Sequence, residues 1–459
     1  MFKSRPHRNI VMIEGSLWRN TLLFAMPIFF SGLLQLFFNA ADTIVVGRFA
    51  GQEALAAVGS VGSLNALLVN IFLGLSVGAN VIVARSAGAG DHEKVHEAVH
   101  TSVTVSIICG VFLAFLGYFV ARPMLLLMGT PEDVLDLAVL YVRIIFIGMP
   151  IQMLYNFAAA ILRAVGDTKR PLYFLTAAGI VNVLLNLFFV IVCQMSVKGV
   201  ALATVLSHFV STGLVVHSLL TRTDGVRLNP RRLGINRKLL WEIIRIGLPS
   251  GIQSSMFSIS NILIQSSINS FGTIAMAGSA AASNLCSFIY QAVAAFQSTA
   301  TTFTGQNVGA RKPRRVMKTQ TVCQLWCLII TGVMGIGNYI FGEQLLSLYN
   351  TDPEVINWGM QRIVVANAPY FLMGIHSVFS GGLRGMGYSL LPMSISLAGI
   401  CLLRVVWLAT AFRAHPTMTC LMLSHPLSWI FTSIPMGIFF FIFYRKLKKS
   451  HSAQELAAE

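Results

Sequence analysis

The sequence predicts an all-α polytopic membrane protein, with about twelve transmembrane helices that form two parallel six-helix repeats around a central cavity. Three observations lead to this fold class. The 459 residues are 55% hydrophobic and only 11% charged, whereas a soluble domain carries about a quarter charged residues. The apolar runs are roughly 20–28 residues long, which is enough to cross a bilayer as a helix. Finally, the second half of the chain repeats the pattern of the first.

Breaks at glycine, proline and charged residues separate these apolar runs from one another. In the first half we expect spans at residues 18–46, 54–84, 98–120, 136–160, 172–194 and 199–220. In the second half we expect them at residues 240–267, 276–303, 319–341, 356–382, 390–412 and 417–444. Each half therefore holds six spans, so both halves enter the membrane from the same side.

A shift of about 221 positions aligns the two halves with each other. Residues 162–166 match residues 383–387, and Pro27 matches Pro249 after a slip of one residue. Parallel repeats of this kind are related by an axis along the membrane normal, and their shared cavity lies between them. The repeat sets the expected domain boundaries: a first six-helix lobe at 1–221, a basic cytoplasmic linker at 222–238, a second lobe at 239–446 and a cytoplasmic tail at 447–459.

The net charge of +16 is explained by topology. Most of the 33 Lys and Arg residues fall in the segments on the side of the membrane that holds the N-terminus, including Lys3, Arg5, Arg8 and the linker. Positive charge marks the cytoplasmic side of a membrane protein. We therefore expect a multi-pass protein of the cell membrane with both termini in the cytoplasm, and a nucleic-acid partner is not needed to explain the basicity.

One polar stripe interrupts the first apolar run. Gln35, Asn39 and Asp42 are spaced i, i+4 and i+7, which places them on one face of a helix. A carboxylate inside a hydrophobic span must be paired, wetted or protonated, and such residues commonly mark ion or substrate pathways. Asp42 is thus the leading candidate for a functional group.

The fifth and sixth spans offer partners for this carboxylate. Asn182 and Asn186 are four residues apart and share a helix face, and Thr204 offers a hydroxyl at a comparable depth. With Asp42, their oxygens predict either a cage for Na⁺ or a polar nest that sets the proton affinity of the carboxylate. Hydrogen bonding between helices is the structural alternative. We expect no other metal site.

The second half repeats the stripe without an acid. Ser258, Asn261 and Gln265 share a face of the seventh span, and Ile264 stands where the first half has Asp42. We expect these polar residues, together with Gln35 and Asn39, to line the substrate cavity. Arg404 lies within the eleventh span and either lines that cavity or extends its side chain toward the membrane surface.

Several function classes find no support. The chain contains no GxxxxGK[ST] phosphate loop, so ATP-driven transport and nucleotide binding are not expected. No converging set of nucleophile, base and metal ligands predicts an enzyme. We expect no cofactor, apart from a coupling ion.

Four motifs together resemble the multidrug and toxic compound extrusion (MATE) transporters. They are the end of the first span at 41–47, the start of the sixth at 199–204, and the two repeat loops at 163–166 and 384–387. The resemblance implies a cation antiporter that expels drugs and metabolites in exchange for H⁺ or Na⁺. It also implies a first-half cation site similar to Asp42, Asn182, Asn186 and Thr204.

The functional expectation is a secondary active antiporter that exports amphipathic, cationic organic compounds by alternating access. The alternative is a flippase for lipid-linked sugars, which belongs to the same superfamily. The expected partners are small organic cations and membrane lipids, and we expect the protein to be a monomer.

Overall fold

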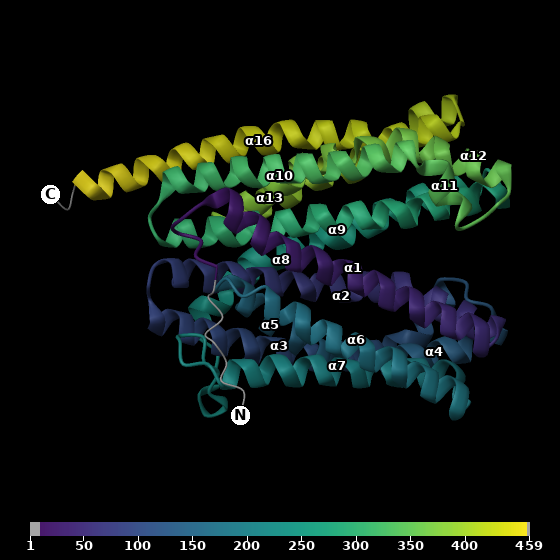
Figure 1. Cartoon of the computed structure of the whole chain (residues 1–459), viewed down its shortest axis with the longest axis horizontal. Helices are drawn as coiled ribbons and strands as arrows, with labels where there is room; N and C mark the ends of the chain where they lie inside the picture. Colours follow the sequence, from purple (N-terminus) through teal and green to yellow (C-terminus); the bar gives the residue numbers. More distant parts are fainter. Residues whose placement is uncertain (1–9, 457–459) are drawn as a thin grey trace. The chain divides into compact units, whose positions relative to one another are not determined.

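The computed structural model describes residues 10–456, apart from the side chains of residues 60, 63–67 and 452–456. The predicted cytoplasmic residues Lys3, Arg5 and Arg8 and residues 457–459 of the predicted tail lie outside the described residues. Throughout the part that is described, regular structure is helical and no strand occurs. Figure 1 shows long helices running along each half of the chain.

Every span expected in the first half corresponds to a helix or a broken helix. These are α1 (Leu17–Phe49), α2 (Gln52–Gly88), α3 (His92–Leu127), α4 (Glu132–Ile147) with α5 (Met149–Ala164), α6 (Lys169–Leu187) with the π-helix η1 (Phe188–Val192), and α7 (Ser196–Leu220). A short 3₁₀ turn, η2 (Pro230–Arg232), lies in the segment that follows.

The spans of the second half are more often interrupted. They are α8 (Arg237–Asn269), α9 (Thr273–Gly309), α10 (Pro313–Ile340), α12 (Pro353–Arg362) with η3 (Ile363–Asn367), η4 (Ala368–Tyr370) and α13 (Phe371–Gly385), α14 (Leu390–Ser396) with η5 (Leu397–Leu402), α15 (Leu403–Trp407) and η6 (Leu408–Phe412), and α16 (Met418–Leu456). A short helix, α11 (Gly342–Ser347), follows α10. Both η5 and η6 are π-helical.

Nine helices of the described chain are long and apolar enough to cross a membrane, and α4 with α5, which bend by 48°, make a tenth span. The remaining two expected spans, α8 and α9, are 33 and 37 residues long. Both carry many Ser, Thr, Asn and Gln residues, which lower their hydropathy. Large apolar side chains stay exposed, for example Phe115 (63%) and Phe119 (69%), as expected for a surface that faces lipid.

By its contacts the chain divides into two compact units. The first unit holds residue 10 and residues 30–251, and the second holds residues 11–29 and 252–456. The early part of α1 therefore packs with the second unit, and the early part of α8 packs with the first. This grouping differs from lobes drawn at 1–221 and 239–446, because the contacts follow packing while the sequence boundaries follow the repeat.

Glycines bring α2 and α8 together inside the first unit. A Cβ atom added at Gly74 would lie 2.2 Å from the backbone nitrogen of Gly251, and one added at Gly78 would lie 2.3 Å from the carbonyl oxygen of Ile243. Only glycine permits such a close approach of two helix backbones. The small-residue spacing of α2 thus serves helix packing.

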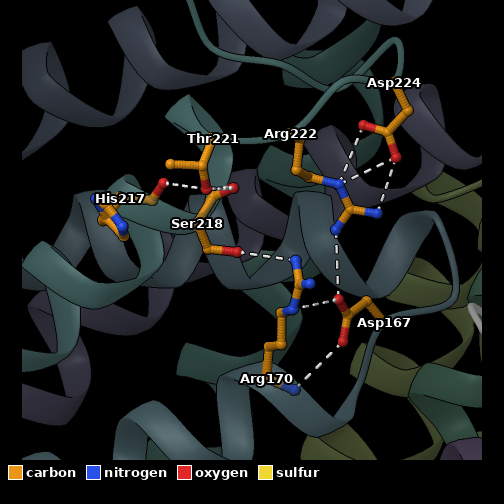
Figure 2. A network of polar contacts seen from close by, with 7 residues as sticks. All are labelled: Asp167, Arg170, His217, Ser218, Thr221, Arg222 and Asp224. Atoms are coloured by element: carbon orange, nitrogen blue, oxygen red, sulfur yellow. Dashed lines mark hydrogen bonds and ion pairs between the residues drawn. The ribbon is translucent and has the colours of Figure 1, made fainter. Parts of the chain in front are cut away.

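The loop between α5 and α6 forms ion pairs with the segment after α7. Asp167 forms ion pairs with Arg170 at 3.4 Å and with Arg222 at 3.3 Å, and Arg222 also pairs with Asp224 at 2.9 Å. Arg170 donates a further bond to the hydroxyl of Ser218 at 3.2 Å, as Figure 2 shows. The predicted linker is therefore held against the first unit at its beginning.

Gly166, in the same loop, has a φ of +90°. Its carbonyl oxygen accepts a hydrogen bond from the backbone N–H of Ile10 at 3.2 Å, and an added Cβ would lie 2.5 Å from the Ile10 oxygen. Gly387, its partner in the repeat, has a φ of +91°. A left-handed conformation favours glycine, which gives the repeated loop motif a structural reason.

Candidate ion-coupling site

A cavity of ≈ 380 Å³ lies within the first unit, between helices α1, α2, α4, α5, α6 and α7. The polar stripe of α1 forms part of its wall, because Gln35, Asn39 and Asp42 all line it. Apolar groups such as Phe38 and Leu175 line the rest. The cavity therefore combines apolar surface with a small number of polar groups, as ligand sites do.

Asp42 is half-buried and meets α6 at this cavity. The Asn186 side-chain N–H donates a hydrogen bond to Asp42 Oδ1, and the same amide nitrogen lies 3.3 Å from Asn182 Oδ1. Asn186 is fully buried and Asn182 is 5% exposed. The i, i+4 spacing of the two asparagines thus places both amides beside the carboxylate.

Asn186 Oδ1 is buried and has no hydrogen-bond partner among the described residues. An amide oxygen of this kind accepts a proton donor or coordinates a hard cation. The neighbouring oxygens are those of Asp42 and of Asn182. Asp42, Asn182 and Asn186 therefore supply carboxylate and amide oxygens, which can accept a proton or coordinate Na⁺.

Thr204 lines the same cavity but makes no direct bond to Asp42. Its hydroxyl donates to the carbonyl oxygen of Val200 at 2.9 Å, which leaves the oxygen's lone pairs available as acceptors. All four residues expected at the cation site thus lie at or against one cavity, and Asp42, Asn182 and Asn186 also form a hydrogen-bonded chain.

Sequence reasoning missed part of the polar lining. It comprises Tyr141 from α4, Gln152 and Asn156 from α5, and Ser207 and His208 from α7. Tyr141 is close enough to Asp42 for the two groups to interact electrostatically. A signal was present for two of these residues: Gln152 and Asn156 have the same i, i+4 spacing as the asparagines of α6.

The second-half candidates lie in other surroundings. Asn261 and Gln265 are exposed on α8, and Gln265 donates to Asn269 Oδ1 at 3.0 Å. Ser258 donates a long hydrogen bond of 3.4 Å to the carbonyl oxygen of Ser254. Ile264, at the position that matches Asp42, is buried in an apolar cluster of the second unit.

Arg404 is also buried in the second unit, with 5% of its surface exposed. Its partners are the hydroxyls of Ser428 at 3.2 Å and Ser260 at 3.4 Å. Extension toward the membrane surface, one of the two arrangements expected for this side chain, is therefore wrong.

The sequence profile of the MatE family matches residues 27–188 and again residues 249–410. The chain belongs to the MatE family. The two matches cover most of both repeats, so the family and the duplicated helical fold expected from the sequence are both confirmed. This MatE chain is accordingly a multi-pass membrane transporter, and its family consists of transporters and not of enzymes.

Known proteins resemble this MatE chain over nearly its whole length. The probable multidrug resistance protein YoeA of Bacillus subtilis is 29% identical, over 84% of this chain and 85% of its own. The FAD transporter of Shewanella oneidensis is 25% identical, over 87% and 88%. A crystal structure of MATE in complex with MaL6 has a TM-score of 0.90 at 21% identity, over 96% and 99%. The last likeness concerns the fold alone.

Proposed function

We propose that this protein is a secondary active antiporter, which exports amphipathic, cationic organic compounds in exchange for H⁺ or Na⁺ by alternating access. The observation that carries the proposal is the contact of Asp42 with Asn186 at the wall of the first-unit cavity. A membrane-embedded carboxylate that is held by buried amides is the type of group that binds a coupling ion.

The geometry suggests how an ion changes this site. An ionised Asp42 only accepts hydrogen bonds, and the Asn186 amide N–H supplies one. A protonated Asp42 carries a donor, for which the unpaired Asn186 Oδ1 is the matching acceptor. Sodium would instead gather the oxygens of both residues and of Asn182. In either case the ion changes the bonds between α1 and α6.

Such a change couples ion binding to transport only if the ion binds two conformations with different affinity. Because α1 contributes residues to both units, a rearrangement of α1 against α6 affects the helix that joins them. We propose that ion binding at Asp42 favours one access state and that substrate binding favours the other.

The lining of the cavity supports an organic cation as the substrate. Asp42 is its one acidic group among the described residues, and neutral polar and apolar side chains supply the rest. A flippase for lipid-linked sugars would need several basic residues there, and no Lys or Arg of residues 10–456 lines this cavity. The names of relatives include multidrug resistance and FAD transport, so family membership alone leaves the substrate open.

We further propose that the protein lies in the cell membrane with both termini in the cytoplasm. The basic segments on the side of the N-terminus support this orientation. Its partners would be the transported compound, the coupling ion and the surrounding lipid, and the proposal requires no nucleic acid, nucleotide or second copy of the chain.

The test is uptake or efflux of a fluorescent organic cation by the purified protein in liposomes, under an imposed pH gradient or an imposed Na⁺ gradient. One gradient is expected to drive transport and thereby to name the ion, and Asp42→Asn is expected to abolish the gradient-driven part. Asp133→Asn, which neutralises an exposed acid at the start of α4, is the matched control. Transport that ignores both gradients would refute the proposal.

A further inference from the structure

Arg404 occupies an irregular part of the second unit. Its helix, α15, is only five residues long and lies between the π-helical segments η5 and η6. The shift of about 221 residues relates η6 to η1 of the first half. The same shift relates η5 to a part of α6 that is regular α-helix. Single π-helical turns are rare and frequently occur at functional sites. The extra π-helical turn is therefore a feature of the half that carries the arginine.

The arginine is buried without a counter-charge. Its guanidinium makes two bonds, both to serine hydroxyls and both longer than 3.1 Å. Arg384, the other buried arginine of this unit, makes a shorter bond of 2.5 Å to Gln253, and the half-buried Arg362 makes one of 2.6 Å to Ser279. A guanidinium has five N–H donors in a planar fork, so most of the donors of Arg404 are unused by described residues.

The acids of the second unit lie elsewhere. Those with described side chains are Glu14, Glu343, Asp352 and Glu354. Glu14 precedes α1 and lies 3.8 Å from Lys312, and the other three are exposed at the starts of α11 and α12. No described carboxylate of the second unit therefore balances the buried charge of Arg404, although a buried charge normally needs a partner.

Two buried histidines, His376 and His425, lie near Arg404. His376 on α13 is 1% exposed, and neither of its ring nitrogens has a hydrogen-bond partner within residues 10–456. Arg404 is close enough to interact electrostatically with His376 and with His425 of α16. One imidazole N–H is thus an unused donor beside an unbalanced guanidinium.

We propose that Arg404, with Ser260, Ser428 and His376 around it, binds the acidic group of a transported amphipathic compound, a carboxylate or a phosphate. The guanidinium fork matches such a group with two parallel hydrogen bonds. The negative charge of the bound group would then neutralise the positive charge of Arg404. This inference rests on the proposed export function and extends its substrate class from organic cations to zwitterions and organic anions.

The two charged sites would then have different tasks. Asp42 in the first unit takes the coupling ion, and Arg404 in the second unit takes the acid of the cargo. A compound that has no acidic group is exported without using Arg404. The inference therefore predicts that, of two substrates that differ in a single carboxylate, an Arg404 substitution lowers transport only of the one that carries it.

The test compares rhodamine 123, a cationic methyl ester, with rhodamine 110, the same dye with a free carboxylate. Transport of each dye is measured in liposomes for the native protein, Arg404→Gln and Arg404→Lys. Arg404→Gln is expected to lower transport of rhodamine 110 about tenfold or more, which corresponds to losing a charge-assisted hydrogen-bonded pair. Arg404→Lys keeps the charge without the fork, so its loss is expected to be intermediate.

Transport of rhodamine 123 is the internal control for folding and for the export function. It is expected to stay within about twofold of native in each variant, and Arg413→Gln, an exposed arginine that follows η6, is expected to change neither dye. If no dye moves in the native protein, the export function fails. If Arg404→Gln lowers both dyes equally, or leaves rhodamine 110 unchanged, the inference is overturned and Arg404 has a structural role.

A phosphate could also come from an anionic lipid, so the liposomes are prepared in two compositions. In phosphatidylcholine alone the difference between the dyes is expected to be largest. If phosphatidylglycerol abolishes that difference and raises the thermal stability of the native protein but not of Arg404→Gln, a lipid headgroup occupies the site and the assignment to cargo is refuted.

Discussion

The contact of α2 with α8 allows a substitution to be worked out from the structure. In Gly74→Ala, the new methyl group would lie 2.2 Å from the nitrogen and 2.4 Å from the Cα of Gly251. Ordinary contacts begin at about 3.4 Å, so the two helices must separate by about 1 Å. Backbone atoms cannot turn away as a flexible side chain can, so the strain is shared along the whole contact.

Overpacking of this kind costs about 1–3 kcal/mol. In a regular helix without such contacts, alanine is better than glycine by about 1 kcal/mol, and Gly213 on α7 provides that control because nothing lies within 4 Å of its added Cβ. Gly74→Ala is thus expected to lower the thermal unfolding temperature in detergent by a few degrees, while Gly213→Ala keeps or raises it. Equal stability of the two variants would refute the close-contact argument.

Three further predictions concern the first unit. Asn186→Leu removes the hydrogen-bond donor to Asp42. In liposomes it is expected to lower transport driven by an ion gradient about tenfold, while substrate exchange without a gradient persists. An equal loss of driven transport and of exchange would contradict this. Gly179→Ala places a methyl group 1.8 Å from the Phe38 ring at the cavity wall, so it is expected to raise the transport KM with an unchanged ion requirement, and an unchanged KM would count against it. Asp167→Asn leaves Arg222, whose side chain is 8% exposed, with one acidic partner, Asp224. The expected loss is about 1–3 kcal/mol, as for a buried donor that loses its acceptor, and it appears as a lower unfolding temperature; an unaltered melting curve would disprove it.

Hydropathy predicted where the helices lie, because a bilayer requires long apolar segments whatever their packing. It did not predict where they break. Gly148 separates α4 from α5, and the π-helical segments of the second half have no simple signature in residue type. Nor did the repeat reveal that the early parts of α1 and α8 pack with opposite units, because internal similarity records ancestry and not contacts.

The candidate site was predicted to a similar extent. Spacing along one helix tells which side chains share a face, and it correctly paired Asn182 with Asn186. It does not tell which faces meet, so Tyr141 and Gln152 were missed although they line the same cavity as Asp42. Ser258, Asn261 and Gln265 of α8 do not line that cavity, and their place in a substrate cavity stays a prediction.

The most direct test of the account is ion movement driven by the organic substrate. Liposomes that contain the protein are loaded with an organic cation and diluted into medium without it, and internal pH and Na⁺ are followed with fluorescent indicators. The account predicts that efflux of the cation drives either H⁺ or Na⁺ into the liposomes, and that Asp42→Asn removes this ion influx. Influx of neither ion with the native protein, or an equal influx with Asp42→Asn, would contradict the assignment of Asp42 as the coupling group.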